Sequence, residues 1–370
     1  KAGVNRENTR YTNEGGWYEC DKVRFRQGTP EKIGGWQRIS DAVFLGVCRS
    51  IWNWVTLGSQ NLVGLGTNLK FYIENGGGYY DITPLRKTAA TLGNNPFVTT
   101  NNSANVVVTD ATGGYTVGDF VTFSGADAVG GLDLNGEFQI IDFASATSYT
   151  IVAGSNASSG ATGGGSSVTA AYQINVGPAF AIPIQGWGAS SWGSGLWGIG
   201  AESVEEVRQW SQANFGEDLV FGPRGGTLFY WDASATNNLN QRGVALASLS
   251  GASNVPTIQN LTLVSDISRF VFCFGCNELG SSALNTMLIR WSDQEDATNW
   301  TPSATNQAGD LILSNGTNII AAKQSRQEVL VWTDSAVYAL QYVGAPAVWT
   351  AQLVGENISI ASQNAVAYAN

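Results

Sequence analysis

Histidine is absent from the 370 residues of this chain, and only 13% of the residues are charged. Histidine is the commonest general base near neutral pH and a frequent metal ligand, so its absence removes the usual catalytic and zinc-binding arrangements. The sequence also lacks a nucleophile-elbow motif. These absences favour a protein that is not an enzyme. The enzymatic alternative is a secreted propeller glycosidase, which would need two carboxylates about 5 to 9.5 Å apart in a pocket.

Cysteine is scarce, at four residues: Cys20, Cys48, Cys273 and Cys276. Four cysteines do not make a disulfide scaffold in a chain of this length, so we expect assembly in a reducing cytoplasm. The Cys273-x-x-Cys276 spacing matches redox motifs, but it continues a strand-like run and opens no helix that would lower a thiol pKa. A zinc site would need Cys20 and Cys48, 28 residues apart, as its second pair. The sequence therefore predicts buried structural cysteines, with no metal and no cofactor.

Long apolar runs are missing as well. None approaches the roughly 18 residues of a membrane-spanning helix, so we expect a soluble protein that does not insert into a membrane. The formal net charge of −10 argues against a nucleic-acid-binding surface, because such surfaces cluster Lys and Arg. The charge is unevenly spread: the first fifty residues hold nine of the 19 basic residues against six acidic ones, a balance of +3, and the remainder carries −13.

This asymmetry predicts either a basic arm that docks onto an acidic partner or a solvated strand face. Val23 and Phe25 alternate with charged residues, which indicates a half-buried strand, and a turn at residues 27–30 then leads into a second run. We therefore expect a hairpin within an N-terminal segment of about residues 1–40. The candidate docking residues on it are Arg6, Arg10, Tyr11, Trp17, Arg24 and Arg26.

Glycine and aromatic residues are abundant instead, with 45 Gly, 13 Trp, 15 Phe and 12 Tyr, as in all-β proteins. One pattern recurs: an apolar run, a polar turn and a second apolar run. It occurs at residues 62–64 and 69–72, 219–221 and 228–231, 270–272 and 287–291, and 329–332 and 336–340. Hairpins that return at such intervals are typical of β-propeller blades, because one small sheet cannot bury both its faces alone.

Composition divides the chain into further segments. Residues 41–87 supply a first full repeat, and no Lys or Arg occurs between residues 88 and 207. Within residues 88–176, short strands are expected at 105–109, 120–123, 136–141 and 148–152, with a last one at 168–172, so this segment reads as an inserted small β-barrel or sandwich. Residues 177–370 then hold the remaining blades. The chain ends inside an expected strand, so we expect a propeller that is truncated at its C-terminus.

Three loops offer other chemistry. The glycine-rich stretch 186–198 carries Trp187, Trp192 and Trp197, which we interpret as packing between blades or as an exposed aromatic interface. Asp293, Glu295 and Asp296 have the oxygens of a calcium loop but lack its glycine and distal glutamate, so a turn held by side-chain to backbone bonds is favoured. Residues 222–226 resemble a phosphate-binding loop only in glycine content and are predicted to be a hairpin turn.

Two regions carry a resemblance to a known family. The N-terminal residues 3–11, Trp17-Tyr18, residues 21–28 and residues 30–36 resemble the start of structural proteins of tailed bacteriophages. Residues 289–293, 299–302, 306–309 and 331–338 are similar to the same group. That group resembles the packaged-DNA stabilisation or tail nozzle (hub) proteins of short-tailed phages. The insert, from residue 118 to 138, resembles small β modules of virion proteins that are likened to a half-domain of ubiquitin-activating enzymes. No cysteine occurs between Cys48 and Cys273, so this second resemblance implies no enzymatic activity.

The resemblance implies a propeller-bearing subunit of the virion tail, assembled in the host cytoplasm. Its implied partners are other copies of itself in a hexameric ring, portal adaptor proteins above and tail fibre or needle proteins. Genomic DNA would pass through the ring during ejection without specific binding, and for that reason we expect the acidic body to face the lumen. The alternative function is a carbohydrate- or receptor-binding tail module for host adhesion, which would use the aromatic loop and the insert.

Overall fold

The computed structural model of the chain describes residues 3–7, 9–35, 40–86, 90–177, 207, 209–266 and 268–367. Trp187, Trp192 and Trp197 therefore lie outside the described residues, and so does residue 36 of the N-terminal signature. Strands dominate what is described, and its helical elements are two 3₁₀ turns, η1 (Asn238–Asn240) and η2 (Leu246–Ser248). Among these residues no helix has the length and apolarity to cross a membrane. The chain divides into two compact units, residues 1–43 and residues 44–370.

The first unit, called the arm below, contains one hairpin. Strands β1 (Val23–Arg26) and β2 (Thr29–Lys32) pair antiparallel, with Val23 opposite Lys32 and Arg26 opposite Thr29. The turn residues Gln27 and Gly28 both have positive φ, at 48° and 84°. This geometry is that of the tight turns that match the twist of paired strands. The predicted hairpin is confirmed.

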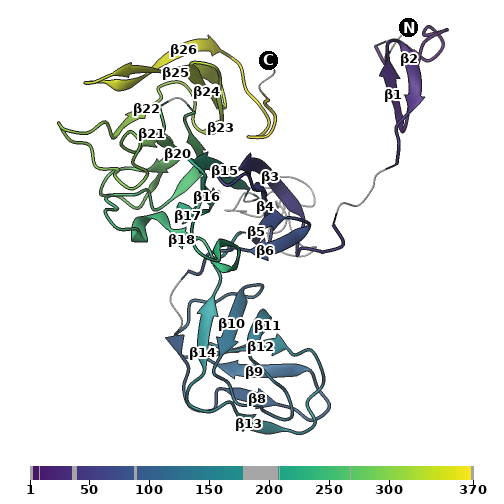
Figure 1. The fold of residues 1–370 in the computed structure, drawn as a ribbon, viewed down its shortest axis with the longest axis vertical. Coiled ribbons are helices and arrows are strands. Elements are labelled where there is room, and N and C mark those ends of the chain that lie inside the picture. The colour runs from purple at the N-terminus through teal and green to yellow at the C-terminus, as the bar shows by residue number, and fades with distance from the viewer. Residues whose placement is uncertain are drawn as a thin grey trace, which may run out of the picture. The chain divides into compact units, whose positions relative to one another are not determined.

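The second unit holds four antiparallel sheets of four strands, each in chain order (Figure 1). The predicted strand pairs form the central hairpin of every sheet, so the all-β, propeller-like fold expected from the repeat is confirmed. We call the sheets the first to fourth blades. Their strands are β3 (Cys48–Val55), β4 (Asn61–Thr67), β5 (Phe71–Asn75) and β6 (Gly78–Asp81); β15 (Trp210–Phe215), β16 (Asp218–Pro223), β17 (Phe229–Trp231) and β18 (Val244–Ala245); β19 (Gln259–Val264), β20 (Val271–Asn277), β21 (Leu284–Trp291) and β22 (Gly309–Ile312); and β23 (Ile319–Gln324), β24 (Glu328–Thr333), β25 (Ala336–Gly344) and β26 (Val348–Glu356).

Consecutive blades stack face to face through three shared cores. Phe71 of the first blade meets Trp210 and Phe221 of the second, with ring centroids 4.9 and 4.5 Å apart. The second and third blades share Val220 and Val271 among others, and the third and fourth blades share a core that includes Phe272 and Trp349, 4.9 Å apart. Alternating apolar residues on both faces of each strand account for this stacking, because each sheet buries one face against each neighbour.

The first strand of every blade lies on the inside of the arrangement. Strand β15 contacts β3 and β19, and β19 contacts β23. These four strands line one cavity of about 790 Å³. The segment that follows β26 also reaches it, where the Gln363 side chain donates a hydrogen bond to the Trp210 carbonyl. The first strands of the four blades thus share one cavity, as the inner strands of propeller blades do.

Between the first and second blades the chain forms a curled eight-stranded sheet, called the inserted module below (Figure 1). It has its own core, with Phe97, Tyr149 and Tyr172 fully buried. All the strands expected here are present, and three short ones were not expected: β7, β8 and β13. The strands are β7 (Ala90–Thr91), β8 (Phe97–Thr99), β9 (Asn105–Thr109), β10 (Phe120–Ser124), β11 (Gly136–Ser145), β12 (Ser148–Val152), β13 (Ala161–Gly163) and β14 (Thr169–Tyr172). Runs of two or three residues carry too little alternation to signal a strand.

Candidate functional site

The docking residues predicted near the N-terminus gather around Tyr18 and Glu19. The guanidinium carbons of Arg6 and Arg10 lie 5.5 and 5.7 Å from the centre of the Tyr18 ring. Both arginines also pair with Glu19, at 3.3 and 3.9 Å. Charge on this side of the arm is therefore partly neutralised within the arm. All of these pairs are exposed, so they stabilise the arm little.

The remaining docking residues lie on or beside the hairpin. The Trp17 ring packs edge-on against Phe25, 6.0 Å away, on one face of the hairpin. Arg24 and Arg26 are exposed on the opposite face, where Arg24 donates a hydrogen bond to Glu31 at 3.2 Å. Tyr11 is 92% exposed. The structure thus brings Trp17 and the two hairpin arginines to opposite faces of one small sheet and leaves Tyr11 in solvent.

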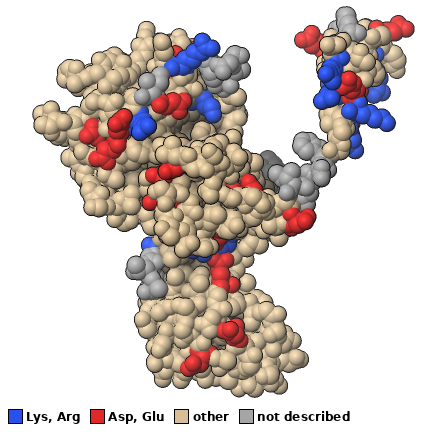
Figure 2. All heavy atoms as spheres, viewed as in Figure 1, with Lys and Arg blue, Asp and Glu red and all other residues tan. Residues whose placement is uncertain are grey.

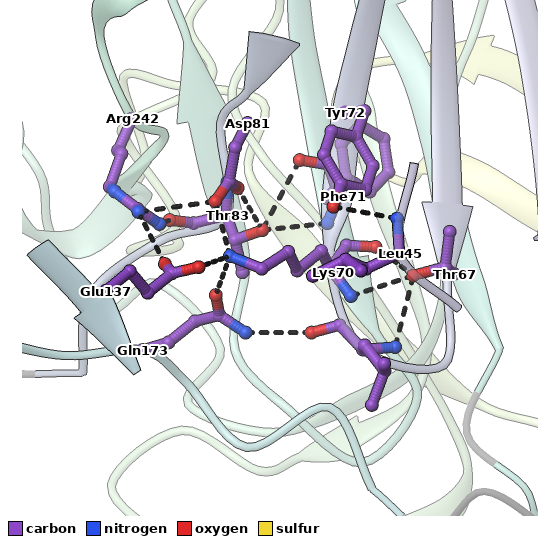
Figure 3. Close-up of polar contacts among 11 residues, drawn as sticks. Leu45, Thr67, Lys70, Phe71, Tyr72, Asp81, Thr83, Glu137, Gln173 and Arg242 are labelled. Atoms are coloured by element: carbon purple, nitrogen blue, oxygen red, sulfur yellow. Dashed lines mark hydrogen bonds and ion pairs between the residues drawn. The ribbon is translucent and has the colours of Figure 1, made fainter. Parts of the chain in front are cut away.

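A buried charge cluster joins three parts of the second unit (Figure 3). Lys70, in the turn between β4 and β5, keeps only 3% of its side chain exposed. Its ammonium group donates to Asp81 of β6 at 2.6 Å, to Glu137 of the inserted module at 2.6 Å and to the Gln173 side chain at 3.1 Å. All three N–H groups of the ammonium therefore have acceptors.

Arg242, in the segment before β18, completes the cluster from the second blade. Its guanidinium lies 3.3 Å from Asp81 and 3.2 Å from Glu137, and it also donates to the Thr83 carbonyl at 2.7 Å. Two cations thus face two carboxylates, so the cluster is neutral. Burial alone would raise the pKa of Asp81. The positive charges of Lys70 and Arg242 lower it by more, so the pKa lies below its ordinary value. The same burial raises the pKa of the adjacent Tyr72 to about 12.

Sequence reasoning missed this cluster. Lys70, Asp81, Glu137 and Arg242 are spread over more than 170 positions, and none belongs to a motif. One signal was available. Glu137 is the only acidic residue among the predicted alternating strand residues 136–141, and the segment around it has no basic residue to pair with. A carboxylate in such a segment has to find its cation in another part of the chain.

The cysteine pair lies in the interior of the third blade. Cys273 and Cys276 are fully buried on β20, and Gly275 between them has φ 60° at an irregularity of the ladder. Burial raises the pKa of Cys273, and it raises the pKa of Cys276 to about 12. All four cysteines are free and none is paired in a disulfide. The predicted burial is confirmed for Cys273 and Cys276, whereas Cys20 and Cys48 are only half-buried.

This burial predicts the thiol reactivity of the native protein. We expect half-buried Cys20 to react with a maleimide at neutral pH, and half-buried Cys48 to react more slowly, because burial raises the pKa of its thiol. Cys273 and Cys276 should stay unmodified until urea unfolds the third blade. Mass spectrometry of the modified peptides checks this, and labelling of β20 in the native protein would contradict it.

The two loops predicted to be turns are turns. The Asp296 carboxylate accepts the Thr298 N–H at 2.8 Å, and the Asp293 carboxylate accepts the N–H groups of Gln294 and Gln307, both at 2.8 Å. These carboxylates thus serve the backbone of their own loop. Residues 224–228 connect the antiparallel strands β16 and β17, so the predicted turn at 222–226 begins in the last two residues of β16. The Gly226 N–H donates a hydrogen bond to the Pro223 carbonyl.

Comparison with known proteins places few constraints on this chain. No family model matches the sequence, and no curated protein matches it. Among solved structures the chain is similar to a phage phi92 endosialidase, at 12% identity and a TM-score of 0.25. The match covers 89% of this chain, which spans about half (52%) of that one. The similar structure is titled as an enzyme, which contradicts the prediction that this chain is not one, and that prediction is withdrawn. Likeness at this TM-score assigns no reaction, substrate or catalytic residue to the chain.

Proposed function

We propose that this chain is a structural subunit of a bacteriophage tail, within the ring that forms the nozzle or hub. The proposal is supported by the family resemblance of both ends of the sequence and by the propeller-like stacking of four blades. The implied neighbours are further copies of the chain, portal adaptor proteins and tail fibres or a needle. The acidic second unit, rather than the basic arm, would face passing DNA, because low affinity for phosphate lets DNA slide.

The observation that carries the proposal is the lack of a core in the arm. Among residues 3–35 that the structure describes, no apolar side chain is buried. Val4, Trp17 and Ile33 are 47%, 42% and 47% exposed. An isolated two-stranded hairpin is marginal in water, and segments of about 40 residues rarely fold without outside support. An arm of this kind gains stability when a partner covers it, which is what a docking element does.

Deletion of residues 1–43 tests this proposal. We expect particles made with the truncated chain to lack it, or to fail to assemble, because the arm supplies the contact to the neighbouring subunit. Leu279→Ala, which changes an exposed apolar residue outside the arm, is the matched control and should be incorporated normally. Quantitative mass spectrometry of purified particles measures both. Normal incorporation of the truncated chain would overturn the docking role.

A further inference from the structure

Among the residues that the structure describes, the first blade has one face that no other blade covers. The face toward the second blade carries Trp54, Phe71 and Ile73. Side chains alternate along a strand, so the opposite face carries the intervening residues. From the register of β3, β4 and β5, this outer face consists of Ile51, Asn53, Val55, Val63, Leu65, Tyr72 and Glu74.

Only part of the outer face is packed. The Phe44 ring lies 6.2 Å from Tyr72 and 5.1 Å from Tyr79, and the Tyr72 hydroxyl accepts the Leu45 N–H, so this end is covered. On β3, however, Ile51, which also borders the cavity between the blades, is 66% exposed and Val55 is 60% exposed. Leu57, just beyond the strand, is 89% exposed. Neighbouring apolar side chains this exposed on one sheet face are typical of an interaction site.

The arm presents a complementary surface. Trp17, Val23 and Phe25 lie on one face of its hairpin, and Lys32 is opposite Val23 on that same face. The arm belongs to the basic part of the chain and the outer face to the acidic part. Figure 2 shows Lys and Arg side chains concentrated on the arm. Each surface is a largely apolar sheet face with charge at its edge. The arm has Lys32, and the blade has Asp81 opposite Tyr72 and also Glu74, whose carboxylate accepts the Gly77 N–H at 2.7 Å.

We propose that the outer face of the first blade binds the arm of a second copy of this chain. The inference rests on the proposed function, in which the arm is a docking element, and names its partner. The hairpin would stack on β3 and β4 as one sheet packs on another, with Lys32 beside Glu74. Within their own units, Ile51 and Val55 on the blade and Trp17 on the arm are exposed, whereas Leu65 and Tyr72 of the outer face are buried, so the contact would be made along β3.

Such a contact joins two different surfaces, so it is heterologous. Each copy donates one arm and accepts another, and repeated contacts of this type close into a ring when the rotation between copies allows it. The proposal therefore gives the symmetric assembly a specific contact. It also explains why an arm without a core and a blade with a bare face occur in one chain.

Two variants, one without the acceptor face and one without the arm, test the proposal, because each should supply what the other lacks. Ile51→Asp with Val55→Asp keeps the arm and loses the acceptor face, whereas deletion of residues 1–43 keeps the face and loses the arm. Light scattering after size exclusion should show each variant as a monomer, against an oligomer of 39.2 kDa subunits for the natural chain. An unpaired charge in the contact should weaken association about a hundredfold or more. Mixing the two variants should give a 1:1 dimer, because one intact arm then meets one intact face.

The control is Val354→Asp, a substitution on the fourth blade at a valine that is 62% exposed, and it should leave the oligomer intact. Circular dichroism and melting of each variant show that it is folded, and Ile51→Ser replaces the aspartate variant if that one unfolds. A monomeric natural chain, or two monomeric variants that do not combine, would overturn the inference. The inference would also be overturned if the aspartate variant still formed the oligomer and the arm deletion did not. In that case the arm would still be a docking element, but its partner would be another surface. An arm deletion that oligomerises normally would reject the docking role itself.

Discussion

Replacing Lys70 by methionine is expected to lower the free energy of unfolding by about 2–3 kcal/mol at neutral pH. The substitution leaves Asp81 and Glu137 facing each other with one cation fewer, and breaking a buried ion pair in this way costs roughly 3–5 kcal/mol. We expect the lower figure because Arg242 still pairs with both carboxylates, whose side chains are 23% and 28% exposed. Methionine preserves most of the volume of lysine, so lost packing contributes little.

The pH dependence of the stability difference between the natural and Lys70→Met proteins checks this prediction. The pKa of Asp81 is lower in the folded chain than its ordinary value of 3.8, so its pairing stabilises the fold at neutral pH and stops doing so as the pH falls through the folded pKa. The stabilities of the natural and Lys70→Met proteins should therefore begin to approach each other as the pH falls below about 4, and should become equal only below the folded pKa of Asp81. Urea unfolding followed by tryptophan fluorescence measures both effects. Lys323→Met, a half-buried lysine on β23, is the matched control and should change stability by less than about 0.5 kcal/mol. A Lys70→Met protein as stable as the natural chain would show that the cluster adds nothing.

The second large effect concerns the core between the first two blades. Phe71→Ala should lower the free energy of unfolding by about 3–5 kcal/mol, the range for truncating a buried phenylalanine. Phe71 is fully buried, and its ring contacts Trp210 and Phe221 from the second blade. A cavity there would separate the two blades and also loosen the turn that carries Lys70.

Phe143→Ala is the control for this substitution, because Phe143 is 47% exposed on the inserted module. It should cost less than about 1 kcal/mol, since little apolar surface leaves water there. Calorimetric melting of both variants gives the comparison. A loss below about 1 kcal/mol for Phe71→Ala would contradict a shared core between the blades.

Local patterns predicted the strands well, because alternation and turn residues act over short distances. The central hairpin of every blade and the hairpin of the arm were expected from residues within about 25 positions of one another. The charge cluster was not expected, because Lys70 and Arg242 are brought together only when the insert returns the chain to the second blade. The short strands β8 and β13 were not predicted for another reason: a run of three residues is too short to show the alternation of apolar and polar residues that marks a strand.

The docking residues illustrate the same limit. Charge counting located the arm and its arginines but did not show that Glu19 and Glu31 pair with Arg6 and Arg24. The sequence also did not predict the exposed outer face of the first blade. Only the stacking order of the blades shows which face of the first blade has no partner.

We propose above that this chain is a repeated structural subunit of a phage tail. Electron microscopy of purified particles that carry an affinity label on this chain tests it most directly. The claim predicts several labelled copies, arranged symmetrically around the tail axis. Particles that lack the labelled chain after washing, while the chain is recovered as a free monomer, would contradict it.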